Sequence, residues 1–231
     1  MALNDKTYNQ DLHLAQHATP DPLQQEFIAL HMYGKQRADY DSQACQQAIT
    51  SDGQSITKLN NPATSHRDLR AATTADLSTD VQAVGDTHNP GDDRKNALLD
   101  RQIIAVDRRY LAAHTDRAGH NDLGATVRQD IEHEIKVRQQ DIAYCDKDRT
   151  KDEPQYIAHD QSFIAALDSG NSKQAADLKQ VLLSDRHRDA ANEQRYITNN
   201  NDASATSNRI ISGLVSKDVM RQFGQLHIVD S

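Results

Sequence analysis

The sequence has little of what a large apolar core is normally built from. It contains no Trp and only three Phe, and apolar residues make up 36% of the chain, against roughly 45–50% in typical soluble domains. A core must therefore be built from Leu, Ile, Val, Ala and the seven Tyr. This composition predicts thin apolar layers between helices, or burial that is completed by a partner or by a second copy.

Glutamate is also scarce, because five Glu stand against 29 Asp. Asp is the poorer helix former, so folding physics does not explain the bias. The resulting composition, rich in Gln, Asn, Asp and Ala, is interpreted as that of a phage virion or accessory subunit, or of a bacterial effector or its partner protein.

Dense charge of one sign and long apolar runs are both missing. The formal net charge is −8, and the 26 basic and 34 acidic residues are mixed along the chain, which disfavours nucleic-acid binding through phosphates. No segment resembles a Sec signal or a membrane span. We therefore expect a cytoplasmic protein as synthesised, one that becomes part of a virion, or one exported by a dedicated system. Cys45 and Cys145 are expected to be reduced thiols, with a disulfide left open.

Helix signals are frequent and strand signals are few. Asp21 followed by Pro22 indicates a helix start, Ser65 with Asp68 indicates another, and Gly170 indicates a helix end. The fold class predicted from these signals is all-α, as an irregular helical bundle of about seven helices.

A long antiparallel αα-hairpin, at about 93–118 and 123–146, is the predicted centre of that bundle. Residues spaced by three and four positions give its first helix an apolar face. The connection between Gly119 and the second helix is short, as in a hairpin. A Glu134–Arg138 pair is expected on the solvent side of that second helix. The predicted apolar face consists of Leu99, Ile103, Val106 and Tyr110.

Three polar segments are predicted to interrupt the helices. Residues 51–65 and 147–155 have the composition of loops, and 199–207 has that of a linker. The predicted domains are a helical domain over 1–198, a linker-like segment over 199–207, and a C-terminal amphipathic helix with a tail over 208–231.

That C-terminal helix is the predicted docking element, because the linker-like segment before it is expected to be flexible and its apolar face is dense. With the end of the hairpin it would bind a protein partner or mediate self-association. The candidate partner-binding residues are Ile211, Leu214, Val215, Phe223 and Tyr110.

The stretch YIAHD contains the clearest candidate for chemistry. His159 and Asp160 resemble the His-Asp pair of the HD-domain phosphohydrolases, although the chain continues QSFIAAL where that family usually has a short turn containing Gly. The resemblance implies an all-helical enzyme with a divalent metal, for which His133 and Asp218 are the further candidate ligands. The alternative is that Asp160 is a helix N-cap.

These observations together favour a binding role over catalysis. We expect a non-enzymatic helical interaction or assembly protein without a cofactor, which binds neither nucleic acid nor a membrane. The alternative is a metal-dependent phosphohydrolase of HD-like type using His133, His159, Asp160 and Asp218, with Asp160 and His159 as the catalytic pair.

Overall fold

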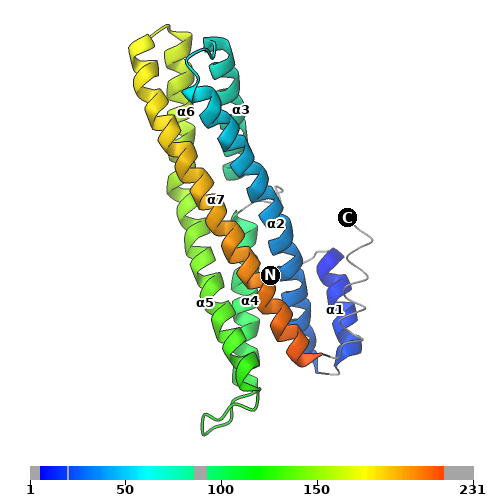
Figure 1. Ribbon diagram of the computed structural model, residues 1–231. Helices are drawn as coiled ribbons and strands as arrows, with labels where there is room; N and C mark the ends of the chain where they lie inside the picture. Colours follow the sequence, from blue (N-terminus) through cyan, green and yellow to red (C-terminus); the bar gives the residue numbers. More distant parts are fainter. Residues whose placement is uncertain (1–5, 20, 86–92, 216–231) are drawn as a thin grey trace. The chain divides into compact units, whose positions relative to one another are not determined.

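The computed structural model describes residues 6–19, 21–85 and 93–215 (Figure 1). Within these ranges the chain is helical and forms no strand, apart from an isolated bridge between Thr115 and Asn121. The all-α prediction is therefore confirmed for the described residues. In chain order the elements are α1 (Lys6–Ala18), α2 (Pro22–Asn60), α3 (His66–Gly85), α4 (Asp93–Ala113), α5 (Ala125–Lys147), a π-helix (Asp148–Asp152), α6 (Glu153–Asp168) and α7 (Ser172–Leu214).

Several helix ends lie where the sequence predicts them. The Leu23 amide donates to Asp21 Oδ1 at 3.0 Å, and α2 begins at Pro22. The Asp68 amide donates to Ser65 Oγ at 3.1 Å, which caps α3. Gly170 has a φ of +69°, a conformation that glycine adopts readily and that ends a helix, and it follows the end of α6.

The polar segments differ from the prediction. Residues 51–60 belong to α2, and residues 199–207 lie inside α7 rather than in a linker. Chain 147–155 contains the end of α5, the π-helix and the start of α6, with Pro154 in the first turn of α6, where a missing amide is tolerated. Tertiary packing overrides the turn propensity of such segments: in α7 it buries the small residues Ala203, Ser204, Thr206 and Ser207.

The connection between α4 and α5 is longer than predicted. It covers residues 114–124, so α4 ends before Gly119 instead of at it. Asp116 Oδ1 accepts the backbone amides of Ala118 and His120, each at 2.8 Å. Gly119, with a φ of +85°, lies within this turn.

The described chain divides into two compact units, each made of separate segments. Unit 1 consists of the described residues within Met1–Tyr40, Leu98–Ile142 and Asn199–Ser231, and unit 2 of those within Asp41–Ala97 and Ala143–Thr198. Four helices are divided between the two units, so that each of them has one segment in unit 1 and one in unit 2: α2, α4, α5 and α7.

Unit 1 contains the larger apolar core. The predicted face of α4 lies in it, since Leu99, Ile103, Val106 and Tyr110 are all buried. The stretch Phe27–Met32 of α2 is buried all round, as expected for a central helix. The core cluster also includes Ile131 of α5, and Ile210 and Ile211 of α7.

Unit 2 has a smaller apolar cluster. Its buried members are Leu59, Leu69, Phe163, Ala166, Ala175 and Leu182. Much of the remaining interior is polar or aromatic: the Tyr196 hydroxyl donates to Cys145 Sγ at 2.6 Å, and Tyr196 packs edge-on against Tyr144. Cys45 and Cys145 do not form a disulfide.

Candidate functional site: buried charge networks

The predicted metal ligands are engaged with other partners. His133 Nε2 lies 2.9 Å from Asp202 Oδ2 in unit 1, and His159 Nδ1 lies 2.7 Å from Asp185 Oδ2 in unit 2. Asp218 lies outside the described residues. Among the described residues, no group of three or more His, Cys, Asp or Glu is arranged to hold a metal ion. The four-residue metal set therefore stays a prediction.

Asp160 is not the helix N-cap that the sequence alternative proposed. It lies within α6, which begins seven residues earlier at Glu153, and it is 1% exposed. Its Oδ2 accepts from Arg186 Nη2 at 2.5 Å. Asp is a good capping residue, but here its carboxyl group binds a buried arginine.

The predicted partner-binding residues lie mostly in the core. Tyr110 and Ile211 are 1% and 0% exposed, and Tyr110 stacks on Phe27 with ring centroids 4.2 Å apart. Leu214 and Val215 are partly buried and pack against the same cluster. Phe223 lies outside the described residues. Within the described residues, the apolar face at the end of α7 therefore packs against the core of unit 1, and the docking role of these residues stays a prediction.

A buried ionic network joins four helices of unit 1 at His31. His31 Nε2 lies 2.8 Å from Asp107 Oδ1 on α4, and its Nδ1 lies 3.4 Å from Glu134 Oε2 on α5 and 3.2 Å from Ser207 Oγ on α7. All four side chains belong to residues with no solvent exposure. Ser207 Oγ donates to Glu134 Oε1 at 2.8 Å, so the hydroxyl is bound to a carboxylate.

Arg138 extends this network along α5. Its Nη2 and Nε bond to Glu134 Oε1 at 2.6 and 2.9 Å, and its Nη1 bonds to Asp100 Oδ1 at 2.5 Å. The Glu134–Arg138 pair predicted from sequence is therefore formed, but it is buried instead of solvated. Beyond Asp100, Asp141 accepts from Asn199 Nδ2 at 3.2 Å.

The network fixes the protonation of His31. Burial lowers the pKa of this imidazole, but the facing carboxylates of Glu134 and Asp107 outweigh burial and raise it to about 9. Burial also raises the pKa of Glu134, and His31 and Arg138 reverse that effect and lower it to about 2. At neutral pH a His31 cation therefore faces a Glu134 anion.

This charge state decides against a nucleophilic role for the Ser207, His31 and Asp107 arrangement. Hydroxyl, imidazole and carboxylate are the side chains of a catalytic triad, and here they are adjacent. A general base must accept a proton, however, and a protonated imidazole cannot. With no exposure at any of the three residues, a substrate also has no access. The arrangement therefore acts as a structural pairing of charges.

A second network surrounds Arg186 in unit 2. This α7 residue is 1% exposed and pairs with Asp160 of α6 at 2.5 Å and with Asp80 and Asp76 of α3 at 3.4 and 3.5 Å. One guanidinium thereby joins α7, α3 and α6. Asp52 of α2 is also buried, and burial raises its pKa to about 7.

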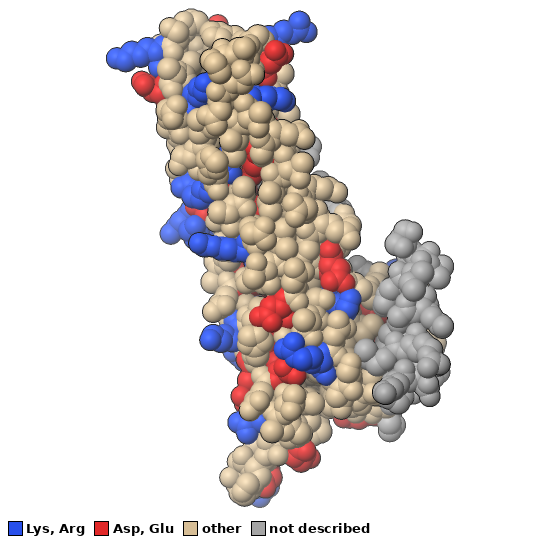
Figure 2. Space-filling view, in the orientation of Figure 1, with Lys and Arg blue, Asp and Glu red and all other residues tan. Residues whose placement is uncertain are grey.

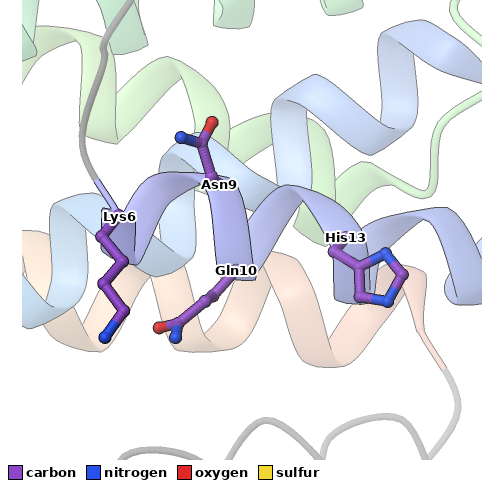
Figure 3. A pocket seen from close by; sticks show the side chains of 4 residues that line it. All are labelled: Lys6, Asn9, Gln10 and His13. Atoms are coloured by element: carbon purple, nitrogen blue, oxygen red, sulfur yellow. The ribbon is translucent and has the colours of Figure 1, made fainter.

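The surface of the described chain is mixed in charge. On the face shown in Figure 2, basic and acidic side chains lie interspersed among other residues. An open pocket on α1 is lined by Lys6, Asn9, Gln10 and His13, as Figure 3 shows. These four residues all come from a single helix and are exposed.

The sequence singled out Glu134, Arg138 and Asp160 for other roles, but it predicted neither network. A signal exists in part, because Asp107 directly follows Val106 in a predicted apolar face, and His31 lies between Leu30 and Met32. A charged residue within an apolar face suggests a buried ion. His31 and its partner Asp107 are nevertheless 76 residues apart in the sequence, and residue spacing cannot predict that pairing.

Comparison with models of protein families, with curated proteins and with solved structures found no match to this chain. Within its described residues, none of the helices combines the length and the apolar content needed to cross a membrane.

Proposed function

We propose that this chain is a helical interaction or assembly protein that works through exposed helix faces, with a second copy or another protein as partner. The observation that carries the proposal is that side chains capable of chemistry are buried and bound to one another. The imidazole of His31, the hydroxyl of Ser207 and the carboxylates that face Arg186 are buried in the two networks, where they bind other side chains of the same chain.

The proposed scaffold is the pairing of α4 with α5 in a bundle. Arg138 of α5 bonds to Asp100 of α4, and the two residues lie equally far from the 114–124 connection. This register supports an antiparallel hairpin at the centre of unit 1.

The proposed contact surface consists of Tyr40 and Leu98 in unit 1. They are 49% and 39% exposed and, with Val81 of unit 2, are the exposed large apolar residues of the described chain. His31 faces Asp107, and a Cβ on Gly34 would meet Ile103, so α2 and α4 run in opposite directions. That register brings Tyr40 and Leu98 to the same level of unit 1. Exposed apolar and aromatic side chains are common anchors of protein interfaces.

Analytical ultracentrifugation of the full chain, together with pull-down from the native host, tests this proposal. Wild-type protein is expected to self-associate or to retain a partner, and the double variant Tyr40→Ser, Leu98→Ser is expected to lose that association. Val81→Ser removes an equally exposed apolar side chain from unit 2 and serves as the matched control. A monomeric wild type whose retained proteins are unaffected by the double variant would contradict the proposal.

The rival proposal is the phosphohydrolase with a divalent metal at His133, His159, Asp160 and Asp218. Its test is the metal content of the untagged protein, measured by elemental mass spectrometry with His159→Gln alongside. Stoichiometric metal that the variant loses would support this enzyme. His159 is a better target than Asp160, because removal of Asp160 would leave Arg186 without its nearest anion.

A further inference from the structure

The charges around Arg186 in unit 2 do not balance. Its guanidinium faces Asp160, Asp80 and Asp76 through three different nitrogens, at 2.5, 3.4 and 3.5 Å. Asp160 and Asp80 are buried, and the Asp76 side chain is 12% exposed. One cation is thus enclosed by three carboxyl groups before any further neighbour is considered.

A fourth carboxyl group comes from Asp52 of α2. It is 6% exposed, and its Oδ2 has no hydrogen-bond partner among the described residues. On the same helix, Ser55 Oγ donates to Asp76 Oδ2 at 2.6 Å. The largest charged influences on Asp52 besides Arg186 are anionic and come from Asp76, Asp80 and Glu193.

Two further charged groups near the cluster, Asp185 and Glu193, are on α7, and as anions they do not restore the balance. Asp185 acts on Asp80 as a further anion, and it is itself paired with His159 and Arg188. Glu193 bonds to Cys45, and burial raises its pKa. Four carboxyl groups therefore depend on one guanidinium.

Ionising all four carboxyl groups would leave three uncompensated negative charges in the interior. Burying an unpaired charge costs several kcal/mol, and a carboxyl group avoids that cost by keeping its proton. A neutral carboxyl group can also donate a hydrogen bond to a neighbouring carboxylate, which an ionised one cannot.

We propose that the carboxyl cluster around Arg186 holds protons near neutral pH and makes unit 2 a pH-sensitive element, tightened by mild acid and loosened above neutral pH. This element would regulate how firmly α3 and α6 are held, through the same side chains that join them to α7.

The acidities of the cluster agree with this geometry. Burial raises the pKa of Asp52 and of Asp160 to about 7, and that of Asp80 to about 6, although Arg186 opposes each increase. The ordinary value for Asp is 3.8. The pKa values of these three carboxyl groups are higher in the folded state than in the unfolded state. Their contribution to stability is therefore fully present below the ordinary pKa of Asp and is lost as pH rises through 6 to 7.

Native-state hydrogen exchange of the full chain between pH 5 and 8.5, corrected for intrinsic exchange rates, measures this effect. Each proton held by the native cluster and released on opening makes the opening equilibrium constant rise about tenfold per pH unit. Peptides from α3 and α6 are expected to show this rise between pH 5 and 7. Protection in these peptides that does not fall as pH rises would overturn the proposal.

Asp52→Asn provides the decisive variant, because the amide mimics the neutral carboxyl group. It is expected to lower the pH slope by about one factor of ten per pH unit and to increase protection at pH 8. Asp177→Asn, at an exposed position of α7 in the same unit, is the control and should behave as wild type. Equal slopes for the two variants would exclude Asp52 as a proton carrier. Should Asp52→Asn not fold, Asp80→Asn is measured in the same way.

Discussion

The two units bury charge in similar amounts but neutralise it differently. In unit 1 two cations share the interior with four carboxyl groups, within a large apolar core. In unit 2 one cation serves four carboxyl groups, beside a small apolar cluster. The members are His31 and Arg138 with Asp100, Asp107, Glu134 and Asp141 in unit 1, and Arg186 with Asp52, Asp76, Asp80 and Asp160 in unit 2.

The difference shows that neighbouring cations can outweigh burial in deciding whether a carboxyl group ionises. Glu134 has no exposure, yet its two cationic partners lower its pKa to about 2. Asp160 is equally buried and shares its single cation, and burial raises its pKa to about 7. Asp141 repeats this pattern inside unit 1: burial, with the neighbouring Asp100, raises its pKa to about 7.

Replacing Arg186 by Met tests the dependence of unit 2 on one cation, and it is expected to have the largest effect. It leaves buried carboxyl groups without compensation, which costs about 3–5 kcal/mol. The loss should be larger at pH 8 than at pH 5, because protons neutralise the cluster in acid. Urea unfolding at both pH values, with exchange of unit 2 peptides, measures the change.

Arg70→Met is the matched control for that experiment. Arg70 also pairs an α3 side chain with a carboxylate of α6, since its Nε lies 2.6 Å from Asp168 Oδ1, but both side chains are about half exposed. Exposed pairs contribute little to stability. Equal effects of Arg70→Met and Arg186→Met would show that burial of the second network has no energetic consequence.

His31→Gln tests the corresponding pairing in unit 1. The pKa of the His31 imidazole rises from 6.5 to about 9 on folding, a shift that corresponds to about 3 kcal/mol of stability. Because the folded value is the higher one, this contribution is present below pH 6.5 and is lost as pH rises through 9. The variant should therefore be less stable at pH 6 and should approach wild type above pH 9. A pH-independent difference would contradict the ionic role of His31.

The helix ends and the core face of α4 were predictable because local chemistry determines them. Asp21, Ser65 and Gly170 satisfy or terminate backbone hydrogen bonds within a few residues of themselves. The face from Leu99 to Tyr110 follows from helical periodicity alone. Neither requires knowledge of the rest of the chain.

The continuous α7 and the charge networks could not be predicted in this way. Segment 199–207 is rich in Asn and Ser, and only burial of Thr206 and Ser207 against other helices explains why it is helical. Asp160 has a local interpretation as an N-cap, which is wrong because the residue lies inside α6; its partner Arg186 is 26 residues away in the sequence. Contacts between segments that are far apart in the sequence decide both cases, and these contacts cannot be inferred from a single sequence.

Two glycines of α2 provide the smallest test of the contrast between the units. A Cβ on Gly34, in unit 1, would lie 2.6 Å from Ile103 Cδ1 and 3.1 Å from Arg138 Nη2, whereas a Cβ on Gly53, in unit 2, meets nothing within 4 Å. Gly34→Ala should therefore lower the free energy of unfolding by about 1–3 kcal/mol, through overpacking beside the ionic network.

Gly53→Ala should instead raise the free energy of unfolding by about 0.5–1 kcal/mol, because alanine loses less conformational entropy in a helix. Thermal and urea unfolding of the two variants measure this difference in sign. A stabilising Gly34→Ala would mean that α2 is free to move away from Ile103 and Arg138. The close packing assigned to the core of unit 1 would then be wrong, and the contrast between the two units would rest on their charges alone.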